Sequence, residues 1–314
     1  MGPIGSFTPP LHPGMPNEKN PGRMITMLRR AFFCLAALSL GALSAAHAQL
    51  PATVKVGVLN DMNGPFADQS GRGSVVAAQM AAEDFTAAGG GFKVGIVSAD
   101  HLNKPDVGDQ IAREWVDRDG VDAIADSVNS GVGFAVNQVM LEKHRTFPAT
   151  NVGSSDLTGK FCAPTTVQWT MDSWAMGSSA ARAMMKLEGD SWYFISFDYA
   201  FGASLQRDAT SMLEKLGGKV VGSVKHPLGT TDFSSYLLQA QSSGAKVVAL
   251  ADTGADLINA VKQAAEFGLT PKQRLAALIV DVDALGLKAA QGMIATASFH
   301  WDLNAGACSV RALG

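Results

Sequence analysis

Glycine-rich and polar segments follow several apolar runs of this sequence, and they hold the residues best suited to bind a small ligand. The first segment, VGVLNDMNGPFADQSGRGS (residues 56–74), contains Gly64, Gly71 and Gly73. Loops that hold phosphate need the spacing GxxxxGK[ST], or GxGxxG directly after a strand. These glycines match neither pattern, no lysine follows them, and Pro65 lacks a backbone N–H. We therefore interpret the segment as a strand-end loop and not as a nucleotide site.

A second candidate is ADSVNSGVG (residues 125–133), where a predicted strand ends and a helical pattern begins. Helix N-termini attract anions through their free backbone amides and the helix dipole. Asn129 and Ser130 stand at this junction, which favours a site for a ligand carboxylate. The alternative is that one of them only caps the helix, and the two roles are compatible.

Further candidates follow other predicted strands. TNVGSSDLTG (residues 150–159) offers hydroxyl groups and accessible backbone, or forms an ordinary polar loop. Acids in the later loops could meet an amine or hydroxyl of a ligand, with plain solvation as the alternative. The residues singled out in these segments are Gly153, Ser154, Ser155, Asp198, Tyr199, Phe201, Asp252, Thr253, Gly254, Asp281 and Asp283.

No set of residues in the sequence has the spacing of a catalytic centre. The nucleophile motif Gly-x-Ser-x-Gly is absent, and the histidines have no evident Ser or Asp partners. Zinc-ligand spacings are absent as well, and only Cys162 and Cys308 follow the N-terminal region. We expect a protein that is not an enzyme and that uses no cofactor or metal.

The loops are separated by alternating strand and helix patterns. Strand patterns cover residues 53–59, 92–99, 121–126, 146–150, 191–197, 219–224, 245–251, 274–280 and 293–299. Between them apolar residues recur with helical spacing, as at Ala77, Ala81 and Phe85. Apolar strands that alternate with helices are typical of parallel sheets covered on both faces. The sequence therefore predicts an α/β protein of two doubly wound lobes, with ligand contacts at the carboxyl ends of the strands.

The N-terminal region carries an export pattern. Residues 1–26 are proline-rich without an apolar period, and we predict a disordered extension. Residues 27–48 combine two arginines, a short apolar run and Ala-His-Ala, which predicts a cleavable signal peptide and not a membrane anchor. Loss of residues 1–48 on cleavage would change the formal net charge from −3 to −6, which disfavours nucleic acid as a partner.

Several segments together resemble the branched-chain amino acid (leucine/isoleucine/valine-type) family of periplasmic ABC-transporter substrate-binding proteins, over about residues 54–304. They are VKVGVLNDMNGPFADQSGRGSVVAAQMAAEDF, VGSSDLTGKFCAPTTVQWTMDSW, DYAFGASLQRD, TDFSSYLLQAQSSGAKVVALA, QAAEFGL and FHWDLN. The resemblance implies a type I periplasmic-binding-protein fold, in which two Rossmann-like lobes close on a ligand. It also implies a monomer in the periplasm of a Gram-negative bacterium that delivers its ligand to permease subunits.

By position, the resemblance assigns Asn129 and Ser130 to the ligand carboxylate, with the 153–155 loop beside them. Phe66 and Ser70 match the lip of the first loop. Phe201 matches an aromatic wall, and the second-lobe polar positions are Asp252, Thr253 and Asp281. The implied ligands are branched-chain amino acids, with an acid for the ammonium group, or aromatic carboxylates, which need none. A ligand-sensing regulator or receptor module of the same fold is the alternative function.

The resemblance also sets expected boundaries: residues 49–170 for the first lobe, 171–300 for the second, and 301–314 for an aberrant tail. Family members continue beyond WDLN and return to the first lobe. The sequence as written is therefore expected to be a truncated product, which would be unstable or bind poorly. The family cysteine expected to pair with Cys162 is not matched, so the partner of Cys162 stays open.

Overall fold

The structure is a computed structural model, and it describes residues 52–187, 189–270, 272–280 and 288–297. These lie within one compact unit, Pro51–Gly314. The predicted extension, signal peptide and tail lie outside the described residues, as do Asp281, Asp283 and Cys308.

Residues 53–168 form a parallel α/β arrangement with the sheet order β2-β1-β3, continued by the pair β4-β5. A parallel bridge between Ala123 and Thr146 links β3 to the residues just before β4. The elements are β1 (Thr53–Asn60), α2 (Gly71–Ala87), β2 (Lys93–Asp100), α3 (Pro105–Asp117), β3 (Ala123–Asp126), α4 (Ser130–Glu142), β4 (Phe147–Ala149), the 3-10 helix η2 (Ser155–Leu157) and β5 (Thr166–Gln168).

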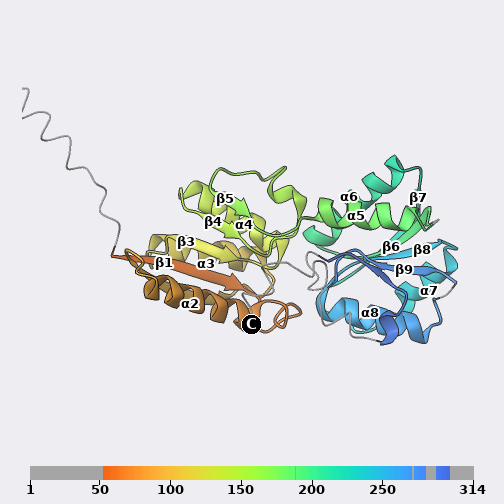
Figure 1. Cartoon of the computed structure of the whole chain (residues 1–314), viewed down its shortest axis with the longest axis horizontal. Helices are drawn as coiled ribbons and strands as arrows, with labels where there is room; N and C mark the ends of the chain where they lie inside the picture. The colour runs from red at the N-terminus through yellow and green to blue at the C-terminus, as the bar shows by residue number, and fades with distance from the viewer. Residues whose placement is uncertain (1–51, 188, 271, 281–287, 298–314) are drawn as a thin grey trace, which may run out of the picture. The chain divides into compact units, whose positions relative to one another are not determined.

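Residues 173–295 form a second parallel sheet with the order β10-β9-β8-β6-β7 (Figure 1). Its elements are α5 (Ser173–Met185), β6 (Ser191–Phe197), α6 (Ala200–Lys215), β7 (Lys219–His226), α7 (Ser234–Ser242), β8 (Val247–Ala251), α8 (Gly254–Glu266), β9 (Arg274–Ala277), the 3-10 helix η3 (Lys288–Ala290) and β10 (Ile294–Ala295).

The two arrangements repeat one strand order. In each, the first strand lies between the second and the third, and the fourth and fifth follow outward. The sheet therefore reverses its winding between β1 and β3, and again between β6 and β8. Ligands of doubly wound sheets bind outside the carboxyl ends of the strands at such a reversal. The predicted fold class, a parallel α/β structure, is confirmed.

The second sheet is covered on both faces. All seven residues of β6 are buried, because Trp192 and Phe194 pack toward α5 and α6, whereas Tyr193 and Ile195 pack toward α7 and α8. This explains why large apolar residues face both sides of the strand, instead of alternating with exposed polar residues.

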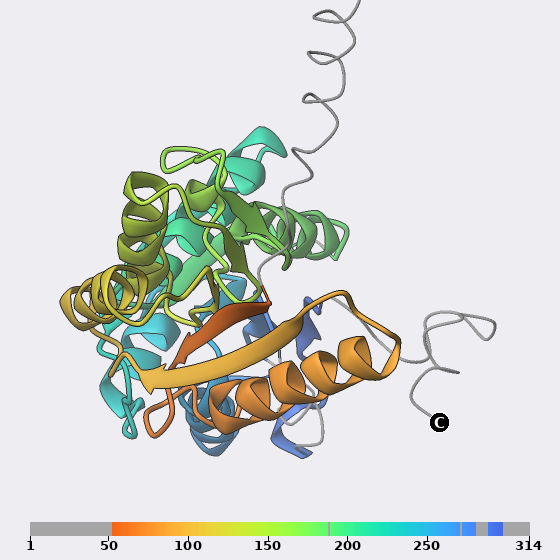
Figure 2. The same cartoon turned by 90° about the vertical axis from the view of Figure 1, so that its left-hand side faces the viewer.

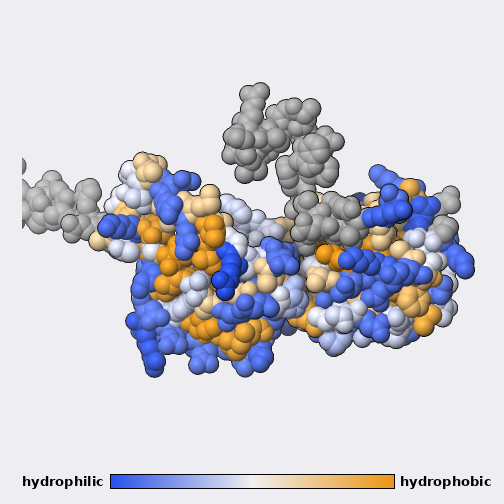
Figure 3. Space-filling view, turned by 90° about the horizontal axis from the view of Figure 1, so that it is seen from below, coloured by the Kyte–Doolittle hydropathy of each residue, from blue (hydrophilic) through white to orange (hydrophobic). Residues whose placement is uncertain are grey.

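Among the described residues, helix α2 is covered on one side only. It packs along β2 and β1, and Gly71 is its single buried residue (Figure 2). Val76 and Met80 are 52% and 59% exposed, although their spacing predicts an apolar helix face. In the space-filling view, hydrophobic residues (orange) form patches on the otherwise polar surface of the first sheet arrangement, which contains α2 (Figure 3).

Some predicted elements differ from the observed ones. Strand β9 ends at Ala277 and β10 covers only Ile294–Ala295, so both are shorter than the apolar runs that contain them. The sequence pattern does not predict β5, a three-residue strand. None of the described helices is long and apolar enough to cross a bilayer. Cys162 is exposed and forms no disulfide with another described residue.

Candidate functional site

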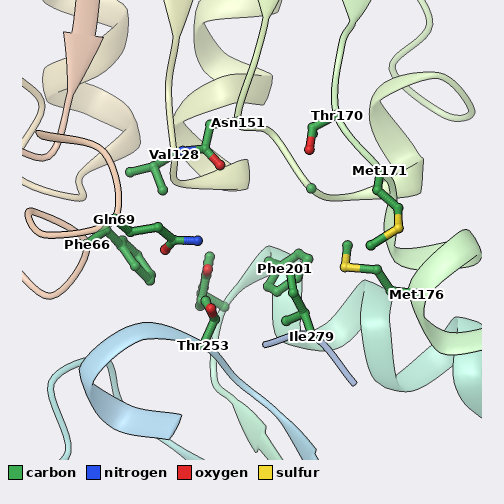
Figure 4. A pocket seen from close by; sticks show the side chains of 12 residues that line it. Phe66, Gln69, Val128, Asn151, Thr170, Met171, Met176, Phe201, Thr253 and Ile279 are labelled. Atoms are coloured by element: carbon green, nitrogen blue, oxygen red, sulfur yellow. The ribbon is translucent and has the colours of Figure 1, made fainter. Parts of the chain in front are cut away.

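A cavity lies where the carboxyl ends of the central strands meet, and it encloses about 370 Å³ of space, part of it open to solvent (Figure 4). Residues 53–171 supply Phe66, Gln69, Val128, Asn151, Gly153, Thr170 and Met171, and residues 173–280 supply Met176, Tyr199, Phe201, Thr253 and Ile279.

The strand order explains why these residues meet. Phe66 and Gln69 follow β1 and Val128 follows β3, the two strands between which the first sheet reverses its winding. Tyr199 follows β6 and Thr253 follows β8, the equivalent pair of the second sheet. The cavity therefore contains residues from the winding reversals of both sheets, as expected for a binding site of this architecture.

Aromatic rings form much of the cavity wall. The ring centroid of Phe66 lies 6.1 Å from that of Phe197 and 6.3 Å from that of Tyr199. Tyr199 lies 6.4 Å from Phe201. A side chain at Gly153 would place its Cβ 2.7 Å from the Phe201 ring, so only glycine permits this close approach. Such walls suit a ligand with a flat or branched apolar body.

The polar groups of the cavity are few and uncharged. In Figure 4 the amide nitrogen of Gln69, the amide oxygen of Asn151 and the hydroxyl of Thr170 point toward the open space. No Asp, Glu, Lys or Arg occurs among its described lining residues. The described lining residues therefore offer a ligand hydrogen-bonding groups and no charged side chain.

Helix N-termini at the cavity differ in how their amides are used. At α4, the Asn129 side chain accepts from the N–H groups of Gly131 (2.9 Å) and Val132 (3.3 Å), which is the predicted cap. At α6 and α8, the capping residues Tyr199 and Thr253 line the cavity and make no side-chain cap hydrogen bond. A helix N-terminus favours an anion, and at α6 and α8 no capping side chain competes for the backbone amides, so these two ends are better placed than α4.

A buried group of titratable side chains lies at the same ends of β7 and β8. His226 Nε2 is 3.4 Å from Asp252 Oδ2, and its Nδ1 is 3.8 Å from Asp256 Oδ2. Burial alone would lower the pKa of His226, but the nearby Asp252 carboxylate raises it overall. Burial raises the pKa of Asp252, which His226 opposes. Burial raises the pKa of Asp256 to about 6, despite hydrogen bonds from two backbone N–H groups.

This group makes α8 a weaker anion site than α6. Asp256 stands in the first turn of α8, whereas the first turn of α6 contains no acid. A nearby carboxylate repels an anionic ligand, and the repulsion is strong where water is excluded. The α6 N-terminus, with Tyr199 and Phe201 at the cavity, is therefore the better placed of the two uncapped ends.

The sequence-predicted residues have different positions in the structure. Phe66, Gly153, Phe201 and Thr253 line the cavity. Ser70, Asn129, Ser130, Ser154, Ser155 and Asp252 are not among its lining residues. Asp281 lies outside the described residues.

Two of the predicted serines, Ser154 and Ser155, form hydrogen bonds with residues of α6 in the second sheet arrangement and do not line the cavity. The hydroxyls of Ser154 and Ser204 lie 2.6 Å apart, and Ser155 donates to Asp208 Oδ2 at 2.7 Å. Ser70 donates to Asn60 Oδ1 at 3.1 Å. These residues hold the loops that shape the cavity, which is a supporting role.

Several lining residues were not among the predicted contacts. Gln69, Val128 and Asn151 are chain neighbours of predicted residues or belong to a predicted loop, so the strand-end rule locates their segments. Whether each of these three residues lines the cavity depends on the direction of its side chain, which the strand-end rule does not give. Thr170 and Met171 lie between β5 and α5, and no pattern in the sequence indicates that they face the cavity.

Comparison with known proteins gives the family. The family model described as "Periplasmic binding protein" matches residues 53–312. The chain belongs to the periplasmic binding protein family. The match covers both sheets and every described residue that lines the cavity.

Similar proteins fall within the same group. "Leu/Ile/Val-binding protein homolog 6" of Brucella melitensis biotype 1 is 27% identical over 265 residues, which cover 77% of this chain and 61% of that protein. This chain therefore spans about three fifths of the length of the curated relatives it matches.

Solved structures agree in fold. A periplasmic binding protein from Burkholderia mallei is 42% identical with a TM-score of 0.76, covering 81% of this chain and 68% of that one. A branched chain amino acid ABC transporter periplasmic ligand-binding protein from Burkholderia xenovorans LB400 is 39% identical with a TM-score of 0.65, covering 80% and 68%. The predicted family resemblance is thereby confirmed.

Proposed function

We propose that this protein is an exported solute-binding component of an ABC importer, which captures a small carboxylate-bearing ligand and delivers it to a membrane permease. The observation that carries the proposal is the cavity at the winding reversals of both sheets. Its aromatic and methionine side chains suit an apolar body, and the uncapped N-termini of α6 and α8 suit an anion. The predicted signal peptide supports a periplasmic location.

Two ligand classes fit this cavity, aromatic carboxylates and branched-chain amino acids. An amino acid needs an acceptor for its ammonium group, and the described lining offers amide and hydroxyl oxygens, including that of Asn151, and no acid. Asp281 follows Val280 directly in the chain, and we propose it as an additional acceptor for that class. For both ligand classes, the proposed direct contacts are Phe66, Gly153, Phe201 and Thr253.

The proposal is tested by thermal-shift and calorimetric titration with leucine, valine, benzoate and p-coumarate, with glucose as a neutral control. A ligand at 100 times its Kd stabilises the folded state by about 2.7 kcal/mol. For a protein of this size that raises Tm by roughly 5–10 °C. Stabilisation by glucose, with none by the acids, would contradict the carboxylate assignment.

Variants locate the binding site. Phe201→Ala removes an aromatic wall of the cavity and should weaken binding at least about tenfold. Phe85→Ala, on the exposed side of α2, is the matched control and should leave the Kd unchanged. Equal losses in both variants would place the ligand elsewhere. The import role predicts neighbouring genes for a permease and an ATPase, together with ligand uptake that depends on this gene.

A further inference from the structure

Residues 153–155, in the loop after β4 of the first sheet arrangement, lie along one face of α6 in the second. That face carries Phe201, Ser204 and Asp208, which are three and four residues apart. A Cβ at the glycine would be 2.7 Å from the Phe201 ring. The first serine hydroxyl is 2.6 Å from that of Ser204, and the second donates to Asp208 at 2.7 Å. Three successive loop residues therefore contact successive turns of one helix.

Asp208 is the charged residue of this contact, and its side chain is only 7% exposed. Its Oδ2 accepts from the hydroxyls of Ser155 (2.7 Å) and Ser173 (2.6 Å). Its Oδ1 accepts from Nε of Arg207 at 2.9 Å. One buried carboxylate thus joins the loop, the first residue of α5 and a cation of α6.

Other hydrogen bonds fix the direction of both hydroxyl protons. Ser155 Oγ accepts from Nη2 of Arg207 at 2.9 Å, and Ser173 Oγ accepts from the N–H of Ser155 at 3.0 Å. Each hydroxyl therefore keeps its own proton for Asp208. Removal of the carboxylate would leave both protons without this acceptor, which is costly for groups that are largely shielded from water.

The same loop is also bound to the segment where the chain crosses between the two arrangements. Ser173 N–H donates to the carbonyl of Gly153 at 2.7 Å. Gln168 Nε2 donates to the carbonyls of Val152 (2.6 Å) and Ser154 (3.2 Å). These bonds hold the loop on the crossing segment, whereas the serine hydroxyls hold it on α6.

Gly153 and Phe201 both line the cavity, and Asp208 is not among its lining residues. We propose that Asp208 is a positioning residue for ligand binding, which holds residues 153–155 on α6 and so keeps Gly153 against the Phe201 ring. A wall that is fixed before the ligand arrives avoids the cost of ordering it on binding. The inference rests on the proposed function, because the ligand is the one proposed for the same cavity.

Asp208→Ala is the direct test. Kd is measured by calorimetry, well below the Tm of each variant, for whichever of leucine, valine, benzoate and p-coumarate the wild type binds most tightly. Because the wall is no longer fixed, the Kd should rise at least about tenfold. Ser196→Ala is the matched control, since the Ser196 hydroxyl donates to Gln206 of α6 at 2.8 Å within the second arrangement. Its Kd should stay within about twofold of the wild type.

A reversible cross-link separates positioning from stability. The hydroxyls of Ser154 and Ser204 are 2.6 Å apart, close to the S–S distance of about 2.05 Å. Ser154→Cys with Ser204→Cys, in a background where the three native cysteines are serine, would tie the loop to α6 covalently. With the bridge formed, Asp208→Ala should change Kd by less than about twofold, and reduction should restore the loss of about tenfold or more.

Ser155→Ala provides a second route where Asp208→Ala does not fold or the bridge does not form. It removes one of the two hydroxyl donors and leaves the carboxylate and Arg207 in place. The Kd should rise by about threefold or more. A merely structural role of Asp208 would lower the Tm of both variants and leave the Kd of the folded protein unchanged.

Each outcome decides the inference or its premise. An unchanged Kd in folded Asp208→Ala, or in Ser155→Ala, overturns the inference. A loss of affinity that persists in the bridged protein overturns it as well. In these cases the proposed function stands, because the wild type still binds a carboxylate. Binding of none of the four probes by the wild type overturns the proposed function, and the inference with it.

Discussion

The helices that follow the first strand of each sheet, α2 and α6, have the same place in the strand order but different surroundings. Helix α6 buries Phe201, Leu205 and Leu213, because α5 packs against it. Helix α2 buries only Gly71, and its apolar residues Val76 and Met80 are exposed within the described structure. A stripe of apolar residues on a helix therefore predicts a face that can pack against a neighbour. Whether that face is buried depends on whether another helix or strand lies against it.

The largest expected effect contrasts these two helices. Leu205→Ala in α6 removes a fully buried side chain and should lower the free energy of unfolding by about 2–5 kcal/mol. Met80→Ala in α2 removes a side chain that is 59% exposed, and the change should stay within about 0.5 kcal/mol. Urea denaturation monitored by circular dichroism measures both. Comparable losses would show that α2 is covered in solution.

The second prediction contrasts the buried acids of the two arrangements. Asp126 is surrounded by neutral donors, whereas Asp256 lies beside His226 and Asp252. Because the pKa of folded Asp256 is about 6, above its ordinary value, the folded state binds this proton more tightly than the unfolded state. Its contribution to stability is therefore present at low pH and is lost as the pH rises from about 4 to above 6.

Asp256→Asn cannot ionise and should remove this loss. Its free energy of unfolding, relative to the wild type, should rise by roughly 1–3 kcal/mol across that pH window. Denaturation midpoints at half-unit pH steps give the curve. In Asp190→Asn, the control, the lost carboxylate has a pKa that is lowered by Lys246, so no rise of this sign is expected. A flat difference for Asp256→Asn would refute the raised pKa.

The third prediction uses two glycines in helices of the contrasted regions. A Cβ at Gly177 in α5 would lie 2.8 Å from the backbone nitrogen of Ala209 in α6, so Gly177→Ala should cost about 1–3 kcal/mol. A Cβ at Gly73 in α2 would meet no atom within 4 Å, so Gly73→Ala should stabilise by about 0.5–1 kcal/mol. Differential scanning calorimetry should show Tm changes of opposite sign. A fall in Tm for both would mean that α2 is more tightly packed than described.

The smallest effect concerns ion pairs. Arg113 joins Asp109 and Glu142 on the surface of α3 and α4, and Arg113→Ala should cost less than about 1 kcal/mol, with the loss reduced by salt. Arg207 pairs with Asp156 and with the buried Asp208, so Arg207→Ala should cost more, about 1–2 kcal/mol, because Asp208 loses its cation. Urea denaturation of both variants at about 0.05 and 0.5 M NaCl measures the two losses of stability and their dependence on salt. The reverse order would show that Asp208 needs no cation.

Sequence patterns located the strands, the helices and the strand ends that carry the site. Periodicity reports which faces of an element are apolar, and this is why β6 and α6 are predicted well. It does not report which element will cover a face, so the contrast between α2 and α6 is not predictable from their stripes. The short strand β5 is not predicted, because three residues are too few to show a periodic pattern.

For the site, the sequence by itself determined the segments, since the carboxyl ends of parallel strands converge in any doubly wound sheet. It also determined that Phe66 and Phe201 are the aromatic residues of two such ends. Only the tertiary structure decided that Asn151 lines the cavity and points its amide oxygen into it, whereas Asn129, whose oxygen caps α4, does not line it. The physical reason is that the packing of segments distant in sequence decides which loop residues face the cavity, and local sequence does not encode that packing.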